Sequence, residues 1–274
     1  MAQFSRYAQI VMGPAGSGKS TYCLIMQQHA GLLGKTIKII NLDPAAEIIC
    51  YKPDLDIRKL VTLDDVMEET ELGPNGGLVM ALEYLLEHTD WLKETLDEFA
   101  DDDYIIIDCP GQIELYTHMT IIKDFCKTMH ELSYNICGIY TIDCTFISDA
   151  SKFISASLMA LSAMNQMEIP HVNVLTKCDL IKNKKELEDM LDTEPRDLLF
   201  DLPVYTTKFK NMSEKIANVL SDFNLVNYIP LDISDEETIS AVMYQVDICI
   251  QYGETLEVYP KDNEDIEDDM EVDR

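Results

Sequence analysis

The sequence predicts an α/β fold, a doubly wound and mostly parallel sheet with helical insertions. A short apolar run, Ala8 to Met12, leads into a glycine-rich octapeptide (GPAGSGKS) and then into a helical pattern. Further apolar runs of strand length end in acidic residues and alternate with helical patterns, as is typical of parallel sheets. The length of 274 residues and an apolar fraction of 47% suit one large domain with insertions.

The octapeptide fits the phosphate-binding pattern G-x-x-x-x-G-K-[ST], the P-loop, so the predicted sheet is of the P-loop NTPase type. Its glycines let successive backbone N–H groups point at phosphate oxygens, and the helix behind it adds its positive end. Lys19 is expected to reach the β- and γ-phosphates, and Ser20 to offer its hydroxyl to Mg²⁺. The alternative, a glycine-rich turn before an ordinary helix, does not explain the full pattern. The predicted phosphate-binding residues are Gly13, Pro14, Ala15, Gly16, Ser17, Gly18, Lys19, Ser20, Thr21 and Gly111.

Composition excludes several classes of function. A formal net charge of −29 repels nucleic acid and anionic lipid, so we expect no direct binding to nucleic acid and no membrane association. No stretch approaches the ~20 apolar residues of a membrane span, and the N-terminus has no signal-peptide pattern. The eight cysteines form no C-x-x-C pair, which argues against a zinc site or a disulfide framework and favours a reducing compartment.

The first half of the chain continues with a helix over 21–33 and a strand over 38–42. Asp43 ends that strand at the sheet edge where ligands bind. Beside a P-loop it is a candidate for handling magnesium or water, and a turn- or helix-capping acid is the alternative. Further along, an acidic helix is expected over 54–69, a tight turn at 73–77, and helices over 78–88 and 90–99.

The apolar run 104–107 predicts a buried parallel strand. Asp108 follows it at the Walker B position, where a carboxylate holds Mg²⁺ directly or through water. Gly111 lets a backbone N–H approach the γ-phosphate. Gln112 and Glu114 open the next helix, expected over 115–133. Glu114 either orients attacking water or simply interacts favourably with the helix dipole.

The second half predicts a strand over 136–142, a helix over 150–167 and a strand over 171–175. The last strand ends in Thr176, Lys177, Cys178 and Asp179, which fits the guanine-reading pattern [N/T]-K-x-D. A carboxylate can accept hydrogen bonds from N1–H and the 2-amino group of guanine, and adenine offers neither. The stem of Lys177 can lie along the base.

The remaining segments are predicted from charge and periodicity. Charged helices are expected over 181–225, a short strand over 227–231 and a closing helix over 235–251. From about Tyr259 the chain is acidic and has no apolar pattern, which predicts a disordered tail.

Taken together, these motifs resemble the GPN-loop GTPases. The defining match is the tripeptide Gly73, Pro74 and Asn75, and it accompanies the motifs at 13–21, 41–45, 108–114 and 176–179. Segments 161–164 and 250–254 look most like the third eukaryotic paralogue group. The resemblance implies a dimerising GTPase fold of the SIMIBI type over 1–258, with the GPN insertion at about 54–100 and an acidic tail at 259–274.

In that family two subunits face each other across their nucleotides, so the resemblance implies that Asn75 acts in the partner's site. It also implies GTP or GDP with Mg²⁺ as ligands. The implied water-arranging residues are Asp43, Gln112 and Glu114, the metal-binding ones Ser20 and Asp108, and the guanine-binding ones Thr176, Lys177 and Asp179.

Further implications of the resemblance concern partners and place. The expected partner is the first GPN-loop paralogue or a second copy of the chain, and the expected cargo is RNA polymerase II, assembled in the cytoplasm and imported into the nucleus. The protein itself would be cytoplasmic and would shuttle to the nucleus.

The first half of the P-loop, Pro14 to Gly16, holds no lysine, and no arginine stands at an obvious finger position. Because a supplied arginine is worth ~10³–10⁵ in rate, slow hydrolysis is expected. A scaffold subunit that holds nucleotide with little turnover is the alternative, and a P-loop kinase is a third reading that the Thr176 to Asp179 motif disfavours.

Overall fold

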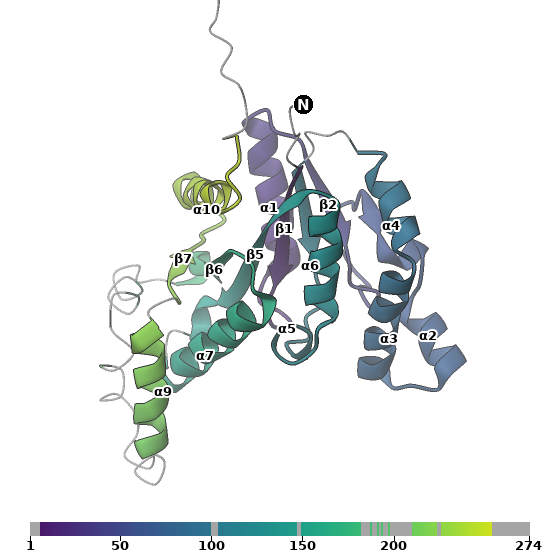
Figure 1. Cartoon of the computed structure of the whole chain (residues 1–274). Coiled ribbons are helices and arrows are strands. Elements are labelled where there is room, and N and C mark those ends of the chain that lie inside the picture. The colour runs from purple at the N-terminus through teal and green to yellow at the C-terminus, as the bar shows by residue number, and fades with distance from the viewer. Residues whose placement is uncertain are drawn as a thin grey trace, which may run out of the picture.

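The computed structural model describes residues 6–99, 104–146, 149–181, 187, 191, 193, 197, 210–223 and 226–253. Seven strands in this part of the chain form a single sheet (Figure 1). They are β1 (Arg6–Met12), β2 (Ile37–Asn41), β3 (Leu55–Asp56), β4 (Tyr104–Asp108), β5 (Tyr134–Asp143), β6 (His171–Thr176) and β7 (Tyr228–Pro230). Their order is β3-β2-β4-β1-β5-β6-β7, and every pair is parallel.

Helices cover both faces of this sheet, which confirms the doubly wound α/β prediction. Residues of β1 alternate between two cores. Tyr7 and Val11 pack with the first and last described helices, whereas Ala8 and Ile10 pack with helices on the opposite face. The helices are α1 (Lys19–Leu32), α2 (Leu63–Thr70), α3 (Pro74–Glu87), α4 (Thr89–Leu96), α5 (Glu114–Thr117), α6 (Ile121–Glu131), α7 (Ala150–Met167), α9 (Lys210–Phe223) and α10 (Glu236–Cys249).

The helix predicted over 54–69 is wrong in its first half. Residues Leu55–Asp56 form edge strand β3, a 3₁₀ turn follows at Ile57–Lys59, and α2 begins only at Leu63. The carboxylate of Asp54 accepts a hydrogen bond from the backbone N–H of Ile39, at 2.9 Å. Such side-chain to backbone bonds compete with helix formation and draw this segment onto the edge of β2.

The tight turn predicted at 73–77 is also wrong, because the glycine-rich run opens α3. Gly73 is the N-cap in extended conformation, and Pro74 takes the first helical position, where its missing N–H costs nothing. Gly77 lies where α3 approaches α2, since an added Cβ would stand 2.9 Å from the Cδ1 atom of Leu63. Asn75 is therefore held in the first turn of a helix.

The helix predicted over 115–133 is interrupted, with α5 ending at Thr117 and α6 beginning at Ile121. Of the charged helices predicted over 181–225, the structure describes α9. The tail at 259–274 lies outside the described residues. Within the described parts of the chain, no helix combines the length and apolar character needed to cross a bilayer.

Candidate functional site

The P-loop connects the end of β1, the central strand, to the start of α1. Gly13 has φ 140°, and an added Cβ there would stand 2.4 Å from the carbonyl oxygen of Thr141 on β5. Only glycine tolerates both conditions. The hydroxyls of Ser17 and Thr141 lie 2.7 Å apart in a hydrogen bond. The loop is thus seated on the ends of β1 and β5, where ligands of doubly wound sheets bind.

Lys19 lies under this loop with its side chain almost fully buried. Its ammonium donates hydrogen bonds to the carbonyl oxygens of Gly13 and Pro14, both at 3.1 Å. Burial lowers the pKa of Lys19, and the nearby carboxylate of Asp108 opposes this shift. The structure therefore places a desolvated cation inside the predicted phosphate cradle.

Asp108 ends β4 next to the P-loop and is also buried. Its Oδ2 atom accepts hydrogen bonds from the hydroxyl of Ser20 at 2.6 Å and from that of Tyr51 at 2.8 Å. Its Oδ1 atom is buried and has no hydrogen-bond partner among the described residues. Burial raises the pKa of Asp108, with the two hydroxyls opposing it.

This arrangement fits Mg²⁺, which takes hard oxygen ligands and few of them from protein. An orphaned carboxylate oxygen beside a serine hydroxyl is the donor set expected for that ion in a P-loop site. Among the described residues, no group of three or more histidine, cysteine or acidic side chains is arranged to hold a metal ion. Tyr51 was missed by sequence reasoning, because no pattern marks an aromatic in this loop as a partner of Asp108.

Asp43 follows β2 on the same edge of the sheet. Its Oδ1 atom accepts a hydrogen bond from the backbone N–H of Ala45 at 2.9 Å, and its own N–H donates to the side chain of Asn41 at 3.1 Å. Burial raises the pKa of Asp43, while the N–H of Ala45 and the cations of Lys19 and Arg58 act against this. The capping alternative is thus realised in part, and the carboxylate still lies within the field of the P-loop lysine.

Gly111, Gln112 and Glu114 lie on the connection from β4 to α5. An added Cβ at Gly111 would stand 2.8 Å from the Cα atom of Ala15, so this backbone touches the P-loop. The amide of Gln112 donates to the Oδ1 atom of Asn75 at 3.1 Å. Glu114 is exposed in the first turn of α5. The link from Gln112 to Asn75 within one chain has no signal in the sequence.

The predicted guanine motif begins at the end of β6 and is tied directly to the P-loop. The hydroxyl of Thr176 donates to the carbonyl oxygen of Ser17 at 2.6 Å. Lys177 takes a left-handed conformation (φ 61°), and its ammonium forms an ion pair with Asp143 at 2.6 Å. Asp179 is exposed in the 3₁₀ turn Cys178–Leu180. A carboxylate and a lysine stem are thereby presented beside the loop.

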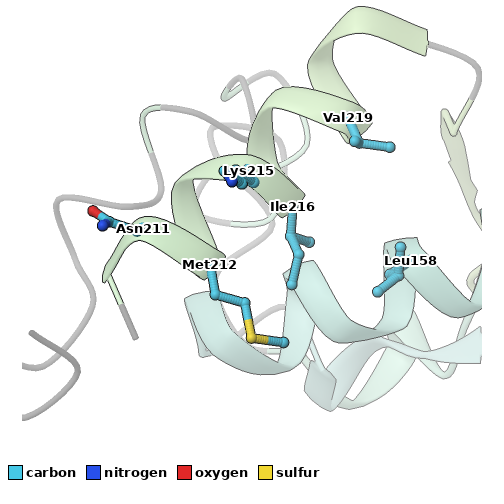
Figure 2. A pocket seen from close by; sticks show the side chains of 6 residues that line it. All are labelled: Leu158, Asn211, Met212, Lys215, Ile216 and Val219. Carbon is cyan, nitrogen blue, oxygen red and sulfur yellow. The ribbon is translucent and has the colours of Figure 1, made fainter. Parts of the chain in front are cut away.

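Two hollows on the described surface have no lining residue in common with the predicted site. One is an apolar hollow of about 500 Å³ between α7 and α9, where Met212 and Ile216 face Leu158 (Figure 2). The other, of about 660 Å³, lies among α6, the start of β5 and the end of α10. The predicted site lies at the carboxyl ends of β1, β4 and β6.

Three kinds of comparison agree with this geometry. A family described as "Conserved hypothetical ATP binding protein" matches residues 11–252. GPN-loop GTPase 3 of Dictyostelium discoideum is 47% identical over 256 residues, which is 92% of this chain and 90% of the relative. GPN-loop GTPase 3 of Xenopus tropicalis is 46% identical over 267 residues (95% and 93%), and that of Saccharomyces cerevisiae 42% over 273 residues (96% and 100%).

Among solved structures, the apo form of PAB0955, a GTPase from Pyrococcus abyssi, superimposes with a TM-score of 0.73 at 22% identity. The match covers 89% of this chain and 97% of that one. This likeness supports the fold. The family match and the long, closely similar relatives show that the chain belongs to the GPN-loop GTPase family.

Proposed function

We propose that the chain binds GTP with Mg²⁺ and hydrolyses it slowly, as a switch that works in a dimer. The observation that carries the binding of a whole nucleotide is the hydrogen bond from Thr176 to the carbonyl of Ser17. It attaches the predicted base-reading motif to the phosphate cradle, so one ligand can span both. The family description mentions ATP. We favour GTP because the carboxylate of Asp179 matches two donors of guanine and none at the corresponding positions of adenine.

Each part of the site has a role in this proposal. Ser20 and Asp108 would hold Mg²⁺, which neutralises developing charge on the phosphates. When nucleotide binds, the ammonium of Lys19 would give up its hydrogen bonds to the Gly13 and Pro14 carbonyls and donate to phosphate oxygens instead. The backbone of Gly111 lies against Ala15 and can donate to the γ-phosphate.

The residues that would position the attacking water are Asp43, Gln112 and Glu114. Asp43 lies within the field of Lys19, and Gln112 is joined to Asn75. Because Asn75 is exposed and Gln112 is half-buried beside it, a second subunit can meet this pair. We therefore place the completion of each site at a dimer interface, with the first GPN-loop paralogue or a second copy as the partner.

Guanine specificity is tested with Asp179→Asn. The amide can donate to the 2-oxo group of xanthine but cannot accept from both guanine donors. We expect GTP affinity to fall at least ~100-fold and XTP affinity to rise above it. The matched control is Asp97→Asn, which changes an exposed carboxylate paired loosely with Arg6 at 3.7 Å. Unchanged GTP affinity in Asp179→Asn would remove the base-reading role.

Dimer-dependent hydrolysis is tested by measuring GTP turnover per subunit against protein concentration, alone and with the first paralogue added, with ATP as the control nucleotide. Turnover that climbs with concentration or partner supports sites completed in trans. Flat and negligible turnover with intact GTP binding favours the alternative, a scaffold subunit held by its nucleotide.

At the level of the cell, the family resemblance supports a role in assembling RNA polymerase II in the cytoplasm and importing it into the nucleus. Replacing the chain with Lys19→Met, which removes the phosphate contact, should leave the largest polymerase subunit in the cytoplasm. Normal nuclear polymerase in such cells would contradict the role. The parent sequence expressed at the same level is the control.

A further inference from the structure

A chain of polar contacts surrounds the loop that carries Asp43. Asn41 is the last residue of β2 and is paired in register with Asp56 of β3. Its side-chain N–H groups donate to Asp56 Oδ1 at 2.9 Å and to the carbonyl of Asp43 at 3.1 Å, while its Oδ1 atom accepts from the Asp43 N–H. Asn41 therefore hydrogen-bonds to both the N–H and the carbonyl oxygen of Asp43, and its own side chain is fixed by Asp56.

Arg58 completes this arrangement from the 3₁₀ turn after β3. Its Nη2 atom donates to Asp56 Oδ2 at 2.6 Å and its Nε atom to Asp56 Oδ1 at 3.0 Å. Its Nη1 atom donates to the carbonyl oxygen of Ala46 at 2.6 Å. Burial would raise the pKa of Asp56, but hydrogen bonds from Arg58 and Asn41 outweigh it and lower that pKa. The Asp56 carboxylate is thus charged and nearly buried, and it connects Asn41 to Arg58.

We infer that Arg58 is a positioning residue, which fixes the 43–46 loop through Asp56 and the Ala46 carbonyl and so aims Asp43 at the phosphate site. The loop is held at both ends, by Asn41 at Asp43 and by Arg58 at Ala46. This inference rests on the proposed water-handling role of Asp43. Arg58 itself acts through the loop, since its three kinds of donor are all engaged with Asp56 and Ala46.

The geometry requires arginine in particular. A guanidinium offers a planar fork to the two oxygens of Asp56 and a further donor to a carbonyl on its other side. Lysine keeps the charge but cannot reach both acceptors in this fixed geometry. A role limited to charge, or to anchoring the insertion, would tolerate lysine or leave hydrolysis unaffected once the protein is folded.

The test compares Arg58→Met and Arg58→Lys with the matched control Lys38→Met, all in the full chain. Lys38 lies on β2, pairs with Asp54 at 3.5 Å and has a side chain 31% exposed, as Arg58 has. We expect both Arg58 variants to lose about 10–100-fold in turnover number with GTP affinity changed less than about threefold. The control should match the parent. If Arg58→Met does not fold, Arg58→Lys alone is compared with the control.

Parent-like turnover in Arg58→Met, or full activity in Arg58→Lys, overturns the inference. A fall in GTP affinity that accompanies the fall in rate also overturns it, since Asp43 loop geometry does not carry phosphate binding. Thermal unfolding of each variant separates these results from a smaller folded fraction.

Dependence on Asp43 is tested by a double-variant cycle. If Arg58 acts through Asp43, then Asp43→Asn/Arg58→Met is no slower than Asp43→Asn alone. Independent, multiplying losses overturn the inference. If Asp43→Asn is itself as fast as the parent, the proposed role of Asp43 fails, and that outcome is visible without any change at Arg58.

The pH profile gives a readout that a purely structural role does not move. The charged groups facing Asp43 are Lys19 on α1, Arg58 on the 3₁₀ turn and Asp108 on β4. Burial raises the pKa of Asp43 and the guanidinium opposes it. Removing Arg58 therefore raises that pKa further, so the acid limb of the turnover profile should move to higher pH in Arg58→Met and stay in place in Lys38→Met. An unmoved limb in both contradicts the inference.

Discussion

The side-chain amide of Gln112 donates a hydrogen bond to the Oδ1 atom of Asn75 at 3.1 Å. This contact joins the segment after β4, which touches the P-loop at Ala15, to the first turn of α3. The family tripeptide is therefore connected to a predicted water-arranging residue inside one subunit, and any effect of a partner on Asn75 can be transmitted to Gln112 of the same chain.

Asn75→Ala should lower GTP turnover at least ~10-fold without weakening GTP binding, because it removes the acceptor that orients Gln112 and the group offered to the partner. Asn75→Ala/Gln112→Ala should be little slower than either single variant if the two act as one unit. Asn211→Ala, an exposed change on α9, is the control. Mixing Asn75→Ala with the parent and following single-turnover rates shows in which subunit the loss falls.

Gly111→Ala should weaken GTP binding ~10–100-fold and destabilise the fold by about 1–3 kcal/mol. The new methyl group would stand 2.8 Å from the Cα atom of Ala15, which is a backbone atom, so the P-loop must shift. The control is Gly31→Ala, where nothing lies within 4 Å of the added Cβ. That site is in α1, and alanine there should stabilise by up to about 1 kcal/mol. Equal effects of the two changes would disprove the close contact.

Asp108→Asn should stabilise the nucleotide-free protein by about 0.5–1 kcal/mol at pH 7 while lowering Mg²⁺-dependent turnover ~100-fold or more. Burial raises the pKa of Asp108, so folding takes up a proton between the ordinary aspartate range and the raised pKa. Stability contributed by this group falls as pH rises through that window, so the buried carboxylate costs more at pH 7 than in acid. Urea unfolding at pH 7 and pH 4.5 should show the advantage of Asn shrinking at the lower pH.

The comparison for that measurement is Asp143→Asn. Burial would raise the pKa of Asp143, but the ammonium of Lys177 at 2.6 Å and the N–H of Thr145 outweigh it and lower the pKa. The same substitution should there cost stability at pH 7. A stabilised Asp143→Asn, or a destabilised Asp108→Asn, contradicts the assigned electrostatics.

His171 should make the protein less stable in mild acid. Burial lowers the pKa of His171 to about 4 from an ordinary 6.5, against a hydrogen bond to the Ile169 carbonyl. Because the unfolded chain binds the proton first, stability falls as pH drops from about 6.5 toward 4, by about 2 kcal/mol at pH 5. His171→Gln should flatten this part of the stability profile in urea titrations between pH 7 and pH 5. An equally steep decline in the variant would assign the effect to other groups.

Sequence reasoning located the central elements well because their signals are local. The strands ending at Met12, Asp108 and Thr176 are apolar runs terminated by motif residues, and all three meet at one sheet edge in the structure. Strand β3 was missed because two residues cannot show periodicity, and its pairing with β2 depends on Asp56 contacting Asn41 from 15 residues away.

In the candidate site, too, local sequence patterns are visible in advance and tertiary contacts are not. Contiguous motifs mark the predicted site residues in the sequence. Nothing local marks Tyr51 and Arg58, because their roles depend on tertiary contacts, to Asp108 and to the 43–46 loop. The misread run at 73–77 has a different cause. Glycine, proline and asparagine favour both a turn and a helix start, and the packing of Gly77 against α2 decides between them.

The position of β1 at the centre of the sheet has a consequence for folding during synthesis. Its neighbours are β4 and β5, so Tyr7 pairs with Tyr104 and Arg6 with Tyr134. Contacts of such sequence separation make folding slow, and during synthesis at ~5–20 residues per second the first strand waits several seconds for its partners. Throughout that interval the apolar residues of β1 are exposed on the nascent chain and can associate with other chains. We therefore expect ribosome-associated chaperones to hold the N-terminal hundred residues until the middle of the chain has emerged.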